Sequence, residues 1–193
     1  GAHGASHEYV SRWVAQREER ADLRIISCHL GGSSSIAAVR DGRGLDTTIG
    51  MSMQTGLAHN NRTGDIDPYL TFYLHESLGM TLEEIKAMYG RKSGLLGLSG
   101  GLSDDFRVIE AARRDNPAAE TAFRAFPYQV KKQIGAFADH RLTVALHGVD
   151  HDFGSFLGKL LGDLGAASAH QPRRARQRRI ALLHREDGAM KPL

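Results

Sequence analysis

Residues 23–49 decide the fold, and they read LRIISCHLGGSSSIAAVRDGRGLDTTI. Three short segments of this stretch have the composition of β-strands: residues 23–28, 34–39 and 44–49. Gly31 and Gly32 mark a tight turn after the first segment. Asp41 and Gly42, which tolerate a positive φ, mark a two-residue hairpin turn after the second. The stretch therefore predicts an antiparallel three-stranded meander whose first turn is rich in glycine and serine.

Helical patterns lie on both sides of the meander. The predicted helices are residues 7–20, 68–78, 82–89, 104–114 and about twenty residues starting at Asn116-Pro117. Thr81 and Glu84 have the spacing of a capping box. Asn116-Pro117 joins an N-cap residue to one that has no amide hydrogen to leave unpaired. Residues 93–101 are expected to be a small-residue loop and residues 142–146 a further strand, so the chain is of the α/β class.

The positive charge is concentrated at the end of the chain. The formal net charge is +3 and the pI is about 9.2, but residues 170–193 carry +5 and the preceding residues carry −2. Residues 166–179 are small, polar and basic without a clear period, which is typical of a solvated or disordered tail. We place a domain boundary near residue 150, with a folded domain at residues 1–150 and a diverged basic tail at residues 151–193.

The composition excludes several classes of protein. The 193 residues are 41% hydrophobic and 24% charged, which is typical of a globular chain rather than a disordered, collagenous or membrane one. No apolar run approaches the roughly 20 residues of a membrane-spanning helix, and the first residues lack the pattern of a secretory signal. Cys28, the one cysteine, can form neither an internal disulfide nor a zinc cage. We expect a cytoplasmic protein.

Two polar segments near the beginning of the chain could carry chemistry. His3 and His7 are four residues apart, so on a helix they would share a face as a zinc pair does, although no third ligand stands nearby. The alternatives are structural or surface histidines and imidazoles that contact an anionic substrate. Residues 29–35, HLGGSSS, connect two strands, and their amides and hydroxyls could cradle a phosphate. A plain hairpin is the alternative there.

Two further segments lie in the middle of the chain. Residues 60–68 read NNRTGDIDP, in which Asp65 and Asp67 could hold Arg62 as a fixed positive fork for an anion. Alternatively, the two aspartates only stabilise a turn and a helix start. Residues 92–107 contain a glycine loop before a predicted helix, which can meet an anion or a ribose although it lacks the lysine placement of a P-loop.

Taken together, these fragments are far more specific than any one of them. In order they read HGASHEYV at residues 3–10, CHLG at 28–31, DTTIGM at 46–51, RTGDIDP at 62–68 and KSGLLGLSG at 92–100. This series closely resembles the acetate kinase family, which also contains propionate and butyrate kinases. The resemblance covers about residues 2–150.

The resemblance implies a fold, an activity and a set of site residues. The fold would be the actin-like (ribonuclease H-like) ATPase fold, and the activity would be transfer of the γ-phosphoryl group of ATP to a short carboxylate with Mg²⁺, giving an acyl phosphate and ADP. His3 and Arg62 match the residues that stabilise the transition state, and they would converge beside the bound polyphosphate. His7 matches a neighbouring motif position.

The resemblance also implies nucleotide-binding residues. These are His29, Leu30, Gly31, Gly32 and Ser33 along the phosphates, and Asp105, Phe106 and Arg107 at the adenosine. The sequence departs from the family at both places: Gly-Gly-Ser replaces Gly-Asn-Gly in the turn, and an extra residue precedes Asp105. No metal ligand is assigned within this chain.

Other departures concern the two ends. The family's N-terminal domain, with its catalytic aspartate, would lie upstream of Gly1, and the loop Phe-Thr-Gly-Gly-Ile-Gly-Glu-Asn is replaced by HDFGS at residues 151–155. A shifted reading frame would produce such a tail, and translating the other frames beyond codon 150 without finding a family motif would argue against it. We therefore expect an incomplete kinase with weak or no activity of its own.

Two alternatives belong to other classes. The chain could be an interaction fragment that completes an enzyme in trans with a separate N-terminal half, or that forms a homodimer as family members do. The basic tail could instead bind nucleic acid through phosphates, but no aromatic interleaving or reading helix supports this interpretation.

Overall fold

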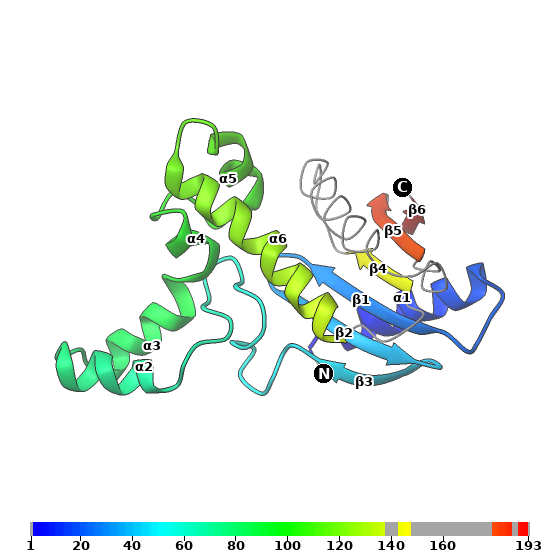
Figure 1. The fold of residues 1–193 in the computed structure, drawn as a ribbon, viewed down its shortest axis with the longest axis horizontal. Coiled ribbons are helices and arrows are strands. Elements are labelled where there is room, and N and C mark those ends of the chain that lie inside the picture. Colours follow the sequence, from blue (N-terminus) through cyan, green and yellow to red (C-terminus); the bar gives the residue numbers. More distant parts are fainter. Residues whose placement is uncertain (1, 138–142, 148–178, 187–188, 193) are drawn as a thin grey trace, which may run out of the picture. The chain divides into compact units, whose positions relative to one another are not determined.

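The computed structural model describes residues 2–137, 143–147, 179–186 and 189–192 (Figure 1). The chain divides into two compact units. Unit 1 consists of Gly1–Thr48 and Val130–Leu193, and unit 2 is the intervening segment Ile49–Gln129. Among the described residues, none of the helices is both long and apolar enough to cross a membrane.

Unit 1 is built on a six-stranded sheet with the order β3-β2-β1-β4-β5-β6. The strands are β1 (Arg24–Leu30), β2 (Ser34–Arg40), β3 (Arg43–Thr47), β4 (Thr143–His147), β5 (Arg179–Glu186) and β6 (Ala189–Pro192). The predicted meander is confirmed, since β1 pairs antiparallel with β2 and β2 with β3. Asp41 (φ 51°) and Gly42 (φ 74°) form the two-residue turn with the positive φ values that the sequence predicts.

Strand β4 is parallel to β1, and β5 is parallel to β4. A parallel pair requires a long crossover connection, and between β1 and β4 the chain passes through β2, β3 and the whole of unit 2. The predicted strand at residues 142–146 is therefore confirmed within one residue as β4. Its parallel pairing places β1 inside the sheet, in agreement with the consecutive burial of residues 25–28.

Helix α1 (Gly4–Arg17) lies across one face of this sheet and contacts β1 and β4 (Figure 1). It begins three residues earlier and ends three residues earlier than the predicted helix at residues 7–20. Its apolar residues share a hydrophobic core with the facing residues of the sheet: Val10, Val14, Leu23, Ile25 and Val39, with Trp13 and Ala15 packed at the edge. The same helix face becomes polar toward its N-terminal end, where the site lies.

Unit 2 is helical. Its helices are α2 (Tyr69–Phe72), the π-helix η1 (Tyr73–Ser77), α3 (Leu82–Arg91), α4 (Gly94–Leu98) and α5 (Phe106–Ala112), and it includes the first part of α6 (Pro117–Phe137). The capping box of Thr81 and Glu84 is present at α3. Asn116 accepts hydrogen bonds through Oδ1 from the amides of Ala118 (2.9 Å) and Ala119 (3.2 Å), which confirms the predicted start of α6.

Two predictions about local structure need correction or extension. Residues 93–101 are not simply a loop, because Gly94–Leu98 form the short helix α4, whose first turn is anchored by backbone hydrogen bonds to residues 59 and 60. Residues 166–178 of the predicted tail lie outside the described residues, but β5 and β6 follow in the same tail. The boundary at residue 150 stays a prediction, since residues 148–178 are not described.

Candidate functional site

A cluster of histidines and serines joins α1 to strands β1 and β2 in unit 1. Its members, called here the histidine–serine cluster, are His3, Ser6 and His7 from the helix end and Ser27, His29 and Ser35 from the sheet. The imidazole rings of His3 and His29 stack with their centroids 4.0 Å apart, and that of His7 stands edge-on, 6.4 Å from each. The predicted transition-state residue and the first predicted phosphate-loop residue are thus neighbours.

Four side-chain hydrogen bonds connect the cluster. His7 contacts Ser27 Oγ through Nδ1 (2.9 Å) and Ser35 Oγ through Nε2 (2.8 Å). Ser35 Oγ also lies 2.8 Å from Nδ1 of His3. A separate hydrogen bond of 3.1 Å joins Ser6 Oγ to Nδ1 of His29. All four span twenty or more residues of sequence, so the cluster ties the helix to the sheet rather than stabilising a local turn.

Simple periodicity explains why these residues meet. His3 and His7 are four residues apart and lie on one face at the start of α1, with His3 at the N-cap. Ser27 and His29 alternate along β1 and therefore share the face of the sheet toward the helix, and Ser35 is directly opposite His29 on β2. Ser27 escaped the sequence analysis as a site residue, and Ser35 was named only as part of the segment 29–35 that could cradle a phosphate, although the alternation and the hairpin register contained the signal for their contacts with the histidines.

The environment of the cluster keeps His7 neutral. Its side chain is buried, and this burial, reinforced by the nearby imidazoles of His29 and His3, lowers the pKa of His7 from 6.5 to about 4. At pH 7 one ring nitrogen of His7 is therefore a donor and the other an acceptor. His3, in contrast, has a left-handed backbone conformation (φ 58°), which non-glycine residues rarely adopt.

The turn after β1 continues from this cluster. It contains the predicted phosphate-loop residues Gly31, Gly32 and Ser33, and Ser34 donates from Oγ to the carbonyl of Gly31 (3.1 Å). Within the described part of the chain, the buried hydroxyl of Ser33 has no hydrogen-bond partner. A buried hydroxyl without a partner is costly unless a further group satisfies it, so this turn has a spare donor at the place where the sequence predicts a phosphate.

Arg62 lies in unit 2, in the loop that precedes α2. Its guanidinium donates from Nη1 to the carbonyl oxygen of Met53 (2.9 Å). Asp65 accepts from the amide of Gly56 (2.8 Å), and Asp67 accepts from the amide of Tyr69 (2.9 Å) at the start of α2. Of the two interpretations left open by the sequence, the structure supports the second, in which both aspartates stabilise a turn and a helix start.

Backbone hydrogen bonds fix the loop that carries Arg62. The amide of Leu95 donates to the carbonyl of His59 (2.9 Å), that of Leu96 to Asn60 (2.8 Å) and that of Ser93 to Asn61 (3.0 Å). Gly94 has φ +61°, and a Cβ there would lie 2.1 Å from the carbonyl oxygen of His59. The glycine loop of the fourth polar segment therefore clamps the arginine loop, a role for which the close approach of two backbones requires glycine.

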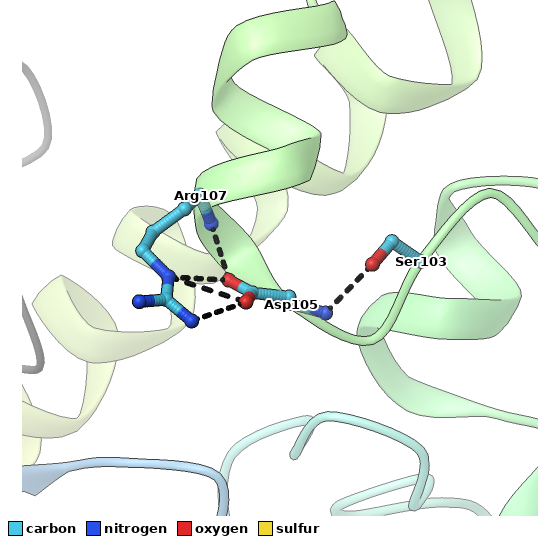
Figure 2. A network of polar contacts seen from close by, with 3 residues as sticks. All are labelled: Ser103, Asp105 and Arg107. Atoms are coloured by element: carbon cyan, nitrogen blue, oxygen red, sulfur yellow. Dashed lines mark hydrogen bonds and ion pairs between the residues drawn. The ribbon is translucent and has the colours of Figure 1, made fainter.

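The predicted adenosine residues lie at the start of α5 (Figure 2). Asp105 caps the helix by accepting from the amide of Arg107 (2.9 Å), and its carboxylate also accepts from Nη2 of Arg107 (2.5 Å). This guanidinium lowers the pKa of Asp105. Phe106 is buried, with its ring 5.3 Å from that of Phe123, so its side chain belongs to the core of unit 2. The side chain of Arg107 is exposed and hydrogen-bonded to Asp105.

The structure brings some of the predicted site residues together and leaves the rest as predictions. His3 and His29 meet within unit 1, and the turn at Gly31–Ser33 follows directly. Arg62 and residues 105–107 belong to unit 2. The convergence of His3 with Arg62 therefore stays a prediction. Both ring nitrogens of His7 contact serine hydroxyls, and no group of three potential metal ligands occurs among the described residues, so the zinc-pair interpretation of His3 and His7 stays a hypothesis.

Comparison with known proteins identifies the family of the chain. The family model described as "Acetokinase family" matches residues 1–150. The acetate kinase of Bacillus subtilis (strain 168) is 44% identical over 140 residues, 72% of this chain and 35% of that protein. The acetate kinase of Dictyoglomus turgidum is 46% identical over 140 residues, 71% of this chain and 34% of that protein.

Solved structures give the same result. The structure of a propionate kinase from Francisella tularensis superimposes with a TM-score of 0.81 and 27% sequence identity. This match covers 94% of the present chain and 52% of the propionate kinase. The structure of Porphyromonas gingivalis acetate kinase superimposes with a TM-score of 0.77 and 29% sequence identity. This match covers 98% of the present chain and 50% of the acetate kinase. The chain spans about a third of the curated relatives and half of the solved ones. It has the actin-like ATPase fold of these kinases and belongs to the acetokinase family.

Proposed function

We propose that this chain supplies part of the active site of an acetate kinase, which transfers the γ-phosphoryl group of ATP to acetate and releases acetyl phosphate and ADP. The observation that carries the proposal is the histidine–serine cluster beside the turn at Gly31–Ser33, in a chain of the acetokinase family. His3 would donate to the transferred phosphoryl group, and the turn would hold the neighbouring phosphates.

Elementary chemistry explains why these residue types suit the reaction. Acetate is already a carboxylate at pH 7 and needs no general base. The difficulty is to hold two anions together while charge accumulates on the equatorial oxygens of the phosphoryl group, so fixed donors and cations supply most of the catalysis. An imidazole donor from His3 and the guanidinium of Arg62 are suitable groups. Arg107, exposed at the start of α5, is the side chain we assign to the adenosine.

Mg²⁺, which the family resemblance implies, has no group of three candidate ligands among the described residues. If the nucleotide carries the ion, as ATP does in solution, the donors of this chain contact the phosphates directly.

We further propose that the 193-residue chain alone has negligible turnover. It spans half of the solved kinases that it resembles, and the catalytic effect of positioned groups is lost when part of the site is absent. The chain would become active by binding a separate N-terminal half, which completes the site in trans. Neither proposal requires the basic tail to bind nucleic acid.

The test combines a turnover assay with a complementation experiment. Purified chain with ATP, Mg²⁺ and acetate, propionate or butyrate is assayed for acyl phosphate, and we expect none above background. Co-expression with the N-terminal half of the Bacillus subtilis acetate kinase should restore turnover with acetate. In that complex His3→Ala should lower kcat about 100-fold, the usual effect of losing one preorganised donor.

Arg12→Ala is the matched control, because Arg12 is exposed on the same helix and its ion pair within the described residues is with Glu8, one turn away. It should leave turnover unchanged. Robust acetyl phosphate formation by the chain alone would contradict the inactivity proposal, and a complex in which His3→Ala retains full kcat would contradict the role of His3.

A further inference from the structure

A chain of hydrogen bonds leads from the centre of β1 to the ring of His3. It runs from Ser27 Oγ to Nδ1 of His7 (2.9 Å), from Nε2 of His7 to Ser35 Oγ (2.8 Å), and from Ser35 Oγ to Nδ1 of His3 (2.8 Å). Ser27, His7 and Ser35 are buried, with 0%, 6% and 0% of their surfaces exposed. The polar atoms of these three side chains therefore need hydrogen-bond partners within the protein.

The single proton of Ser35 sets a strict rule for its neighbours. Among the described residues, the hydroxyl of Ser35 has two hydrogen-bond partners, His3 Nδ1 and His7 Nε2. Since a hydroxyl has one proton to donate and leaving it unpaired in a buried site is costly, Ser35 donates to one ring and accepts from the other. One and only one of these two ring nitrogens is therefore protonated.

When His7 is neutral, two arrangements of the protons along these hydrogen bonds satisfy this rule, and they are called here the first and second alignments. In the first, Ser27 donates to His7 Nδ1, His7 donates from Nε2 to Ser35, and Ser35 donates to His3 Nδ1. In the second, every proton points the other way, so His3 donates from Nδ1. A neutral His3 carries its ring proton on Nε2 in the first alignment and on Nδ1 in the second.

Only the first alignment equips His3 to meet an anion in its neutral form. An unprotonated Nε2 presents a lone pair, which repels phosphoryl oxygens, whereas Nε2–H donates to them. Resting on the proposed function of His3, we propose that His7 and Ser35 are positioning residues that fix the proton of His3 on Nε2. The tautomer of His7, buried one helical turn away, thus decides whether His3 is a donor.

The test reads the tautomers directly by NMR in the complete 193-residue chain. Histidine labelled with ¹⁵N gives two-bond ¹H–¹⁵N correlations that distinguish a protonated from an unprotonated ring nitrogen. Spectra of His3→Gln and His7→Gln assign the two rings. At pH 7 we expect both His3 and His7 to have the proton on Nε2. A proton on Nδ1 of His3 would overturn the proposal.

Variants of Ser35 test whether the link is causal. Ser35→Ala should abolish the single tautomer of His3 and give averaged nitrogen resonances, whereas Ser35→Thr retains the hydroxyl and should retain the tautomer. Ser6→Ala is the control, since it removes a hydroxyl bonded to His29 and leaves the three links in place. An unchanged His3 tautomer in Ser35→Ala, or an equal change in Ser6→Ala, contradicts the proposal.

These readouts do not depend on turnover. If Ser35→Ala does not fold, the tautomers of the unsubstituted chain and of Ser35→Thr still decide between the two alignments. Failure of complementation would count against the proposed function alone, and a wrong tautomer would count against the positioning role alone.

Discussion

His3 and Arg62, the two residues assigned to the phosphoryl group, are held in different ways. His3 is oriented by side-chain hydrogen bonds from Ser35 and, through it, from His7. Arg62 is located by its backbone, since the loop around it is clamped to α4 by amide–carbonyl bonds and by the close approach of Gly94. The position of His3 thus depends on titratable side chains, whereas that of Arg62 depends on glycine and on peptide groups.

This difference has consequences for what each site tolerates. The histidine–serine cluster depends on the protonation state of a buried imidazole, so it should respond to pH and to changes of hydroxyl or imidazole groups. The clamp of the arginine loop is made of main-chain hydrogen bonds and of a close approach at Gly94, so this loop should be intolerant of a side chain at the clamping glycine. The predictions below test this contrast.

The largest effect is expected from Gly94→Ala. The new Cβ would lie 2.1 Å from the carbonyl oxygen of His59 and 2.6 Å from that of Arg62, in a left-handed backbone conformation. Because all these atoms belong to the main chain, the contact cannot be relieved by rotating a side chain. We expect a loss of about 4 kcal/mol of unfolding free energy, measured by urea denaturation with circular dichroism.

Gly90→Ala in α3 is the matched control, because a Cβ there meets nothing within 4 Å and its backbone is helical. It should stabilise the protein by about 0.5–1 kcal/mol. If Gly94→Ala were no more harmful than Gly90→Ala, the description of α4 as a rigid clamp would be wrong.

The sequence predicted much of this arrangement, and the exceptions have physical causes. Turn chemistry at Asp41-Gly42 and N-cap chemistry at Asn116 are local, so both were confirmed at the residue. Residues 93–101 were predicted as a loop because their four glycines disfavour a helix. The short helix α4 forms nevertheless, since its amides bond to the loop at His59 and Asn60, which no local pattern reveals.

The same reasoning applies to the candidate site. His3 and His29 were identified through the family resemblance, and the pairing of α1 with β1 brings them together. Ser27 was missed, and the contacts of Ser35 with His3 and His7 were not predicted, because serine in a strand is common and its role here depends on which face of the sheet α1 covers. That face follows from tertiary packing rather than from composition.

An intermediate effect is expected from pH, and the group that carries it is His7 in unit 1. The pKa of His7 is lowered to about 4 from an ordinary value of 6.5, so the unfolded chain binds the proton more tightly. Stability is therefore complete above pH 6.5 and falls as the pH drops toward 4. Between pH 7 and pH 5 the loss should be about 2 kcal/mol.

Fluorescence of Trp13, the one tryptophan, reports this loss because Trp13 packs at the edge of the core under α1. In urea denaturation, the difference in unfolding free energy between pH 7 and pH 5 should be smaller for His7→Gln than for the parent chain, by about the 2 kcal/mol assigned to His7. His75→Gln, which changes an exposed histidine on η1, should leave the difference intact. Equal pH dependence of stability in the parent chain and in His7→Gln would contradict the claim that the histidine–serine cluster depends on the protonation state of His7.

The smallest effects should come from the pair at the start of α5, which is both local and exposed. Asp105→Ala removes the N-cap of α5 and should cost about 1 kcal/mol, whereas Arg107→Ala should cost less than about 0.5 kcal/mol because an exposed ion pair contributes little. Both values are measured by urea denaturation with circular dichroism. Asp105→Asn, which retains a capping oxygen but not the charge, should lie between them. The assignment of Arg107 to adenosine predicts in addition that Arg107→Ala weakens ATP binding while stability stays nearly constant. Unchanged ATP binding in Arg107→Ala would leave this guanidinium with a structural role alone.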